Sequence, residues 1–131
     1  MNKTLIYPKD HPPSRGAYSP GIRIDLGSAA LLLITGQLAL DADNEVIAAG
    51  NAAEQTEQVF RRIGAILEAG GMGFADVVKV DTLLTDMRDF AAFSAVRNRY
   101  FAESRPVSTL LEVKGLAKPG LCVEIEVVAV K

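Results

Sequence analysis

The chain has 131 residues, 49% of them hydrophobic and 23% charged, which excludes a disordered chain and suits one folded domain over residues 1–131. Its formal net charge of −2 gives no general attraction to nucleic acid, and its longest apolar run is too short to span a membrane. One cysteine and one histidine exclude a disulfide framework and a metal site rich in these residues, so we expect no such metal centre. The unpaired cysteine and the absence of a signal-peptide pattern predict a cytoplasmic protein.

The first part of the chain is predicted to form strands. Ile22–Leu26 alternates apolar and polar residues, as a half-buried strand does, whereas Leu31–Thr35 is continuously apolar and is expected to be more deeply buried. The preceding residues 12–21 are rich in Pro, Gly and Ser and cannot be helical. Shorter strands are expected at Lys3–Tyr7 and, beyond a turn, at Glu45–Ala48.

Two helices are predicted further on. The first begins after Asn51, which can cap it while Glu54 completes a capping box, and it ends at two glycines, residues 70 and 71. Its apolar residues recur at helical spacing and form one stripe: Val59, Ile63, Ile66 and Leu67. The second is expected to be capped by Asp86 or Asp89 and closed by Pro106, and its expected apolar face consists of Phe90, Phe93, Val96 and Tyr100.

Three further strands are expected, at Val77–Leu84, Ser108–Val113 and Val123–Val130. This order indicates an α+β fold in which both helices cover one face of a mixed six-stranded sheet. The other face is expected to be apolar too, because Val128 and Val130 point to it. Soluble monomers rarely expose such a patch, so we expect this face to pack against another subunit; the alternative is a loop folded over it.

Few side chains are available for chemistry. Glu124 and Glu126 share one face of the last strand; Glu126 suits a solvated strand end, whereas Glu124 in a cleft would act as a general base or position a water. Tyr18 lies on a loop bounded by Gly and Pro, where it either caps a pocket or anchors the loop. Gly36 either lets a ligand approach the backbone closely or forms a turn. Solvated helix-surface positions are expected for Arg61, Arg62, Arg88 and Arg99.

Several segments match one family in order and spacing over most of the chain. Residues 16–20 (GAYSP) look like its GPYSQ loop, and Thr35-Gly36-Gln37 followed by Asp41 looks like its SGQ-x-x-x-D segment. The first helix, residues 76–90 and the final Val-Glu-Ile-Glu strand continue the match. The chain thus resembles the RidA family, also called the YjgF family.

This resemblance implies a chorismate-mutase-like fold assembled as a homotrimer with three clefts between subunits. It also implies hydrolysis of reactive enamines and imines to keto acids and ammonia without metal or cofactor. Within that reaction the resemblance implies that Glu124 orients the hydrolytic water, that Tyr18 lines the pocket and that the backbone at Gly36 assists in holding the substrate carboxylate.

The sequence departs from the family where the substrate carboxylate is held. The family's P-A-R-S motif reads Pro106-Val107-Ser108-Thr109, so Ser108 stands in place of the carboxylate-binding arginine. A hydroxyl lacks the bidentate ion pair, worth about 2–4 kcal/mol or about 30- to 1,000-fold in affinity. On the second helix Ser94 replaces an asparagine and Arg97 a tyrosine, so Arg97 or Arg105 is a candidate substitute for the missing cation.

Two hypotheses from different classes follow. The first is a RidA-like trimer that hydrolyses a small, atypical enamine or imine, with Glu124 and Tyr18 catalytic and with Gly36, Ser108, Ser94, Arg97 and Arg105 binding the substrate. The second is a related trimer that binds a small molecule, such as a carboxylate, without turning it over. Ribonuclease activity has been claimed for relatives under the name endoribonuclease L-PSP. The acidic charge balance and the few aromatic residues disfavour it here, so no nucleic-acid partner is expected. No membrane partner is expected either.

Overall fold

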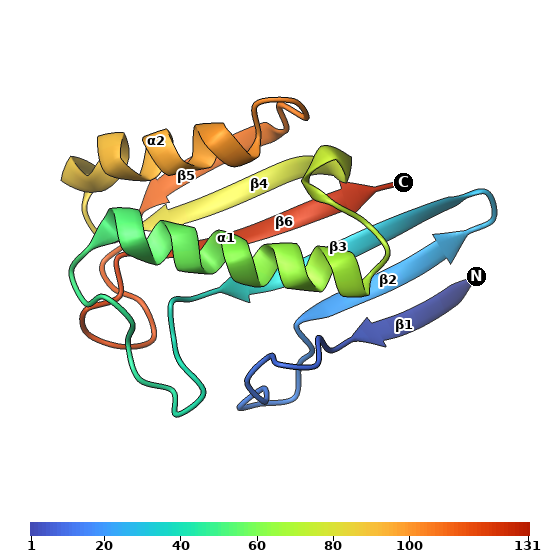
Figure 1. Ribbon diagram of the computed structural model, residues 1–131, viewed down its shortest axis with the longest axis horizontal. Coiled ribbons are helices and arrows are strands. Elements are labelled where there is room, and N and C mark those ends of the chain that lie inside the picture. Colours follow the sequence, from blue (N-terminus) through green and yellow to red (C-terminus); the bar gives the residue numbers. More distant parts are fainter.

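A computed structural model describes all 131 residues, with two helices on one face of a six-stranded sheet (Figure 1). The strands are β1 (Asn2–Ile6), β2 (Gly21–Leu26), β3 (Ala29–Gln37), β4 (Val77–Leu84), β5 (Val107–Glu112) and β6 (Val123–Val130). The helices are α1 (Ala52–Ala69) and α2 (Phe90–Tyr100), and short 3-10 turns lie at η1 (Phe74–Asp76) and η2 (Met87–Asp89). The predicted α+β architecture is therefore confirmed.

The sheet order β1-β2-β3-β6-β4-β5 places the C-terminal strand in the middle of the sheet. All neighbours are antiparallel except β4 and β5, the parallel pair that α2 connects. Strand β6 therefore contacts both β3 and β4, and the glutamates of β6 lie between the ends of these two strands.

Helix α1 forms where it is predicted, because its N-cap and its apolar stripe define the same segment of the chain. The Asn51 Oδ1 atom accepts a hydrogen bond from Glu54 N at 3.1 Å, which is the N-cap half of the predicted capping box. The four residues of the predicted stripe are fully buried against the sheet. Polar side chains are buried with them, since Gln55 donates to Gly120 O at 2.8 Å and accepts from Cys122 N at 2.7 Å, which fastens α1 to the start of β6.

Three predicted details are wrong. Residues 45–48 form no strand, because this segment makes only one isolated bridge, between Leu40 and Val46. Phe90 is 44% exposed, so the buried face of α2 is narrower than its sequence pattern indicates. Asp86 caps η2 by accepting from Arg88 N, and α2 itself begins without a side-chain cap.

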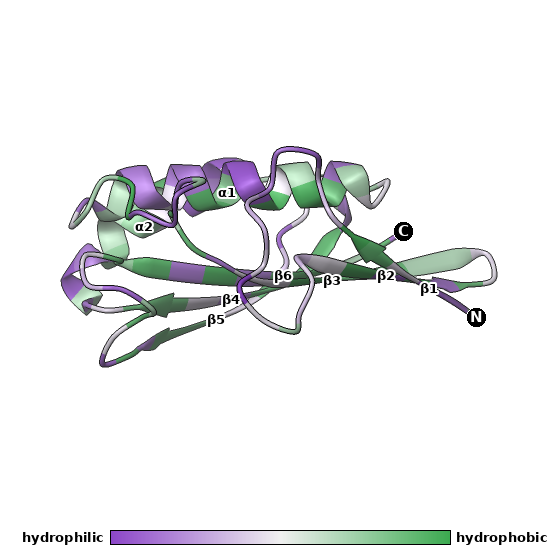
Figure 2. Cartoon of the chain, turned by 90° about the horizontal axis from the view of Figure 1, so that it is seen from below, coloured by the Kyte–Doolittle hydropathy of each residue, from purple (hydrophilic) through white to green (hydrophobic).

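The sheet face opposite the helices carries no helix (Figure 2), and several exposed apolar side chains lie on it. In β2 the polar Arg23 points to the helix side, where its guanidinium donates to Gly70 O at the end of α1 at 2.6 Å, so Ile22 and Ile24 point to the open face. Exposed apolar side chains on this face include Leu5, Leu33, Leu111 and Val130. Neither helix combines the length and hydrophobicity needed to cross a membrane.

Candidate functional site

Strand β3 ends in a bulge that brings Gly36 against Glu124. The register of β3 on β6 shifts between Ile34 and Gln37, which leaves Thr35 and Gly36 as the bulged residues. A Cβ atom at position 36 would lie 2.2 Å from Glu124 Oε1 and 2.9 Å from its Cδ. Only glycine leaves room for the Glu124 carboxyl group, so the close approach at Gly36 is made by this side chain.

The Glu124 side chain points to the open face of the sheet, because its neighbours Val123 and Ile125 are buried under the helices. It is half-buried. Desolvation raises the pKa of the Glu124 carboxyl group, and repulsion from Glu126 raises it further. A poorly solvated carboxylate with a raised pKa is a stronger base than a surface glutamate, which suits it to accept a proton from water.

This burial predicts a pH-dependent effect on stability. Because the pKa of Glu124 is raised above the ordinary value of 4.5, the folded chain keeps this proton to higher pH than the unfolded chain, and ionisation destabilises the fold. We expect Glu124→Gln to raise the free energy of unfolding at pH 7, with this advantage disappearing as the pH falls below about 4. Urea unfolding at both pH values measures it. The exposed Glu103 gives the control Glu103→Gln, and a Glu124→Gln effect that is the same at both pH values would contradict the prediction.

Tyr18 lies between two cavities next to this bulge. It is 55% exposed and lines a cavity of about 720 Å³ on the open face, which Leu33, Glu126 and Val128 also line. With Thr35 and Gly36 it also lines a smaller cavity of about 270 Å³. That Tyr18 caps a ligand pocket stays a prediction. Glu126 is exposed, as predicted.

The other predicted substrate-binding residues gather elsewhere in the same chain. Arg97, Arg105 and Ser108 line a cavity of about 480 Å³ beside α2. Ser108 pairs with the buried Val80, so it lies on the helix side of the sheet, whereas Glu124 points to the open side. The structure therefore brings together two groups of predicted residues and keeps the groups apart within one chain.

Arg97 is the better ordered cation of this second group. Its Nη2 donates to Ser94 Oγ at 2.9 Å, its Nε donates to Asn98 Oδ1 at 3.1 Å, and its guanidinium lies 5.4 Å from the centre of the Phe93 ring. Arg105 is exposed, has a backbone φ of 45° and makes no side-chain hydrogen bond. Ser94 thus orients Arg97, a role that its place in the sequence did not reveal.

Sequence reasoning missed the residues around the 270 Å³ cavity. His11 and Lys118 line it, and so does Arg62, which is half-buried and not the solvated helix-surface residue that was expected. These residues come from three distant segments, and no spacing in the sequence relates them. No three side chains of His, Cys, Asp or Glu lie close enough together to hold a metal ion.

Comparison with known proteins gives consistent matches over nearly the whole chain. The family model described as Endoribonuclease L-PSP matches residues 8–131. A RutC family protein of Pyrococcus horikoshii is 40% identical over 98% of both chains. The 2-iminobutanoate/2-iminopropanoate deaminase of Capra hircus is 37% identical over 98% of this chain and 90% of its own.

The 3-aminoacrylate deaminase RutC of Acinetobacter baylyi is 36% identical over 98% of both chains. Among solved structures, RidA from an Antarctic Psychrobacter species matches with a TM-score of 0.81 and 35% identity, over 96% of this chain and 98% of the RidA chain. The likeness therefore extends to sequence, length and fold.

Proposed function

Because the chain belongs to the endoribonuclease L-PSP family, the family of RidA and YjgF proteins, we propose that it hydrolyses a small enamine or imine to a keto compound and ammonia. The observation that carries this proposal is the half-buried Glu124 carboxyl group, which has a raised pKa and packs against Gly36. Relatives named as deaminases of imines and of 3-aminoacrylate support the reaction class.

The reaction needs only a positioned base and water. The Glu124 carboxylate accepts a proton from water as the water oxygen bonds to the imine carbon. Protonated Glu124 returns this proton to the nitrogen, and the hydroxyl group of the adduct supplies the second proton. The carbon–nitrogen bond then breaks, and ammonia leaves as the carbon–oxygen double bond forms. An enamine first gains a proton on carbon and becomes the imine. Tyr18 lines the cavity of about 720 Å³ on the open face, and in this proposal it contacts the substrate there.

The complete site lies between subunits of a homotrimer in this proposal. Two features of the single chain support it: the Glu124 and Arg97 groups are on different sides of the sheet, and the open face carries exposed apolar side chains. Docking one chain's open face on a neighbour would bury that apolar surface. It would also allow Gly36 and Glu124 of one chain to meet Arg97 and Ser108 of the next.

Arg97 holds the substrate carboxylate in place of the arginine that Ser108 replaces. Ser94 and Phe93 already fix the guanidinium, so binding costs little side-chain entropy. We expect Arg97→Ala to raise KM for a carboxylate-bearing imine by about 10- to 100-fold, with kcat changed much less. Arg88→Ala, which removes an exposed arginine outside the cavity, is the control. A KM unchanged by Arg97→Ala would assign the carboxylate to another group.

The function itself is tested by adding purified protein to enamines and imines generated in the assay. These include 2-iminobutanoate, 3-aminoacrylate and imines without a carboxylate, and release of ammonia and keto compound is followed against the buffer rate. Acceleration supports the proposal. Decay of every compound at the buffer rate overturns it, and a thermal shift with one of them would then assign binding without turnover.

A further inference from the structure

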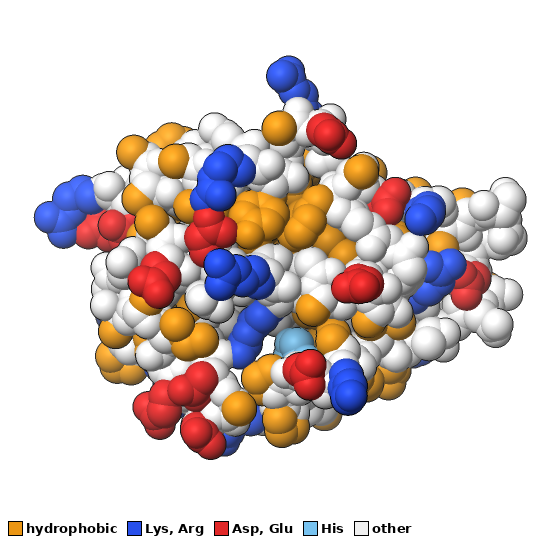
Figure 3. Space-filling view, viewed as in Figure 1, with side chains coloured by type: hydrophobic (Ala, Val, Ile, Leu, Met, Phe, Trp, Pro, Cys, Tyr) orange, Lys and Arg blue, Asp and Glu red, His pale blue; other side chains and the backbone are white.

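The cavity of about 270 Å³ lies between the loop of residues 11–18, the loop after β3 and helix α1. Its lining contains the basic residues Arg15, Arg62 and Lys118, together with His11, and one acidic residue, Asp41. In Figure 3 the pale-blue histidine borders a hollow below α1, with basic side chains and one acidic side chain around it. The formal charge of the whole chain is negative, so this is a local reversal of sign.

Arg62 lines this cavity and also a neighbouring cavity of about 570 Å³, which Arg61 lines as well. Arg62 is half-buried on α1, and its guanidinium makes neither a hydrogen bond nor an ion pair with any other residue of the chain. Desolvation lowers the pKa of Arg62, and the nearby Asp41 raises it to a smaller extent. The Asp41 carboxylate is itself engaged, since its Oδ1 accepts from Asp43 N and Glu45 N at 2.9 Å each. The forked donors of Arg62 thus remain available in a partly desolvated place.

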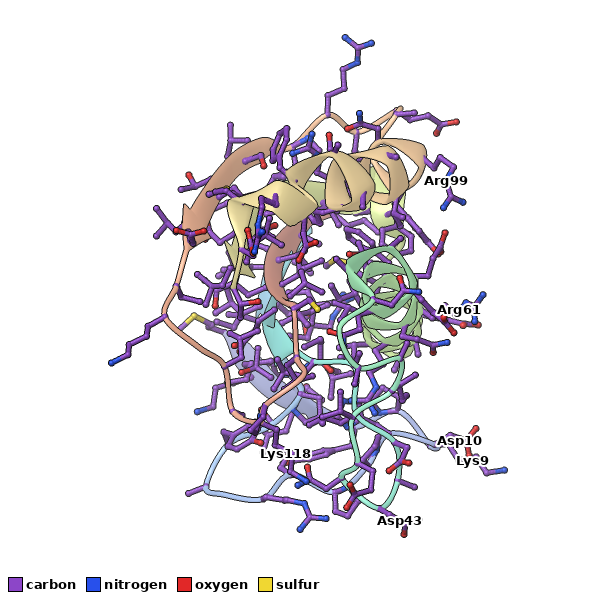
Figure 4. The ribbon with its side chains drawn as sticks, turned by 90° about the vertical axis from the view of Figure 1, so that its left-hand side faces the viewer. Lys9, Asp10, Asp43, Arg61, Arg99 and Lys118 are labelled. Atoms are coloured by element: carbon purple, nitrogen blue, oxygen red, sulfur yellow. The ribbon has the colours of Figure 1, made fainter.

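Other polar residues line the same cavity. The Ser14 hydroxyl oxygen is buried and has no hydrogen-bond partner. His11 fastens its loop to β3, because its ring nitrogens lie 3.0 Å from Gln37 Oε1 and 2.7 Å from Pro12 O. Lys118 donates to Asn44 O, which joins the two loops that close the outer side of the cavity (Figure 4).

We propose that this cavity binds a small oxyanion, a carboxylate or phosphate group, held by the Arg62 guanidinium and the Ser14 hydroxyl, with Arg15 and Lys118 on the outer side. Arg62 gains the partners that it lacks in the chain, and Ser14 gains an acceptor. Asp41, the single acidic residue of the lining, accepts a hydrogen bond from the backbone of its own turn. The basic residues of the lining outnumber it, so the cavity has a net positive charge. The site is distinct from the Arg97 cavity, and an anion can bind there without any reaction taking place.

Titration calorimetry with inorganic phosphate, and then with citrate, tests the proposal at a constant ionic strength set by sodium chloride. We expect Arg62→Gln to weaken phosphate binding by about 10- to 100-fold and Ser14→Ala to weaken it about 3- to 10-fold. The matched control is Arg61→Gln, which removes the same charge from the next residue. Arg61 is exposed on α1 outside this cavity (Figure 4), so less than a twofold loss is expected.

Two results would overturn the proposal. One is that neither anion binds the wild-type chain, and the other is that Arg61→Gln and Arg62→Gln weaken binding equally, which is the behaviour of general electrostatic attraction. Thermal unfolding in chloride alone shows that the variants are folded. The Glu124→Gln chain should bind phosphate as the wild type does, so failure of this site and failure of the proposed catalysis are separate outcomes.

The anion has two possible sources, because Gly36 lines this cavity and also packs against Glu124. If it is a second acidic group of the substrate, phosphate competes with a dicarboxylic imine and Arg62→Gln raises KM for that imine only. If it is a separate anion, a small keto acid leaves the phosphate affinity unchanged. Either of these two results agrees with an oxyanion site in this cavity and identifies the anion that fills it.

Discussion

Replacing Glu124 with glutamine is expected to lower kcat/KM for imine hydrolysis by about 100- to 10,000-fold, the usual contribution of a positioned general base. Glutamine keeps the size of the side chain beside Gly36 but cannot accept the proton of the attacking water. The loss should fall on kcat more than on KM, because the base acts in the transition state. Initial rates of ammonia release over a range of imine concentrations measure it.

Glu126→Gln is the matched control for this prediction, since Glu126 is exposed on the same face two residues further along β6. Its carboxylate repels that of Glu124 and raises the pKa of Glu124. Activity that needs ionised Glu124 falls as the pH drops through this pKa. Glu126→Gln should therefore move the acid limb of the rate profile to lower pH with little loss at neutral pH. Equal losses in the two variants would contradict the role given to Glu124.

Gly36→Ala is expected to lower kcat/KM by about 10- to 100-fold although it adds one methyl group. The new Cβ would lie 2.2 Å from Glu124 Oε1 and 3.0 Å from its Cγ, so the Glu124 side chain must leave its position. The backbone at Gly36 is not in the left-handed region, and alanine fits its conformation. The matched control is Gly73→Ala, because nothing lies within 4 Å of a Cβ at Gly73. The same assay measures both variants.

A double variant separates this displacement from a general disturbance of the fold. If Gly36→Ala acts by moving Glu124, adding it to Glu124→Ala should cause almost no further loss, because the group that it displaces is already gone. If the losses of kcat/KM in the two single variants multiply in the double variant, Gly36 acts independently of Glu124. Urea unfolding of each variant shows whether any loss reflects unfolding.

Elements with a strong local signal were predictable from the sequence. Asn51 and the stripe from Val59 to Leu67 predicted α1, and β4 and β6 have their predicted bounds, because caps, helical periodicity and apolar alternation act within the element itself. The strand expected at residues 45–48 failed because it has no neighbour to pair with beyond a single bridge.

The candidate site was predictable residue by residue but not as an arrangement. Glu124, Tyr18 and Gly36 were all identified from the sequence, yet the contact of Gly36 with Glu124 depends on a bulge in the register of β3 on β6. The side of the sheet on which Ser108 lies depends on its pairing with β4. Pairing between distant strands leaves no trace in local composition, and neither does the half-burial of Arg62.

The claim that one site is built from two chains is tested most directly by mixing two variants. Glu124→Gln and Arg97→Ala chains with different tags are produced together, and particles carrying both tags are purified and assayed. If each cleft combines the Glu124 group of one chain with the Arg97 group of the next, every trimer that carries both tags has one cleft in three with both groups intact. We expect recovery to about a third of wild-type kcat/KM, whereas activity no higher than the average of the two parent variants would contradict a site built from two chains.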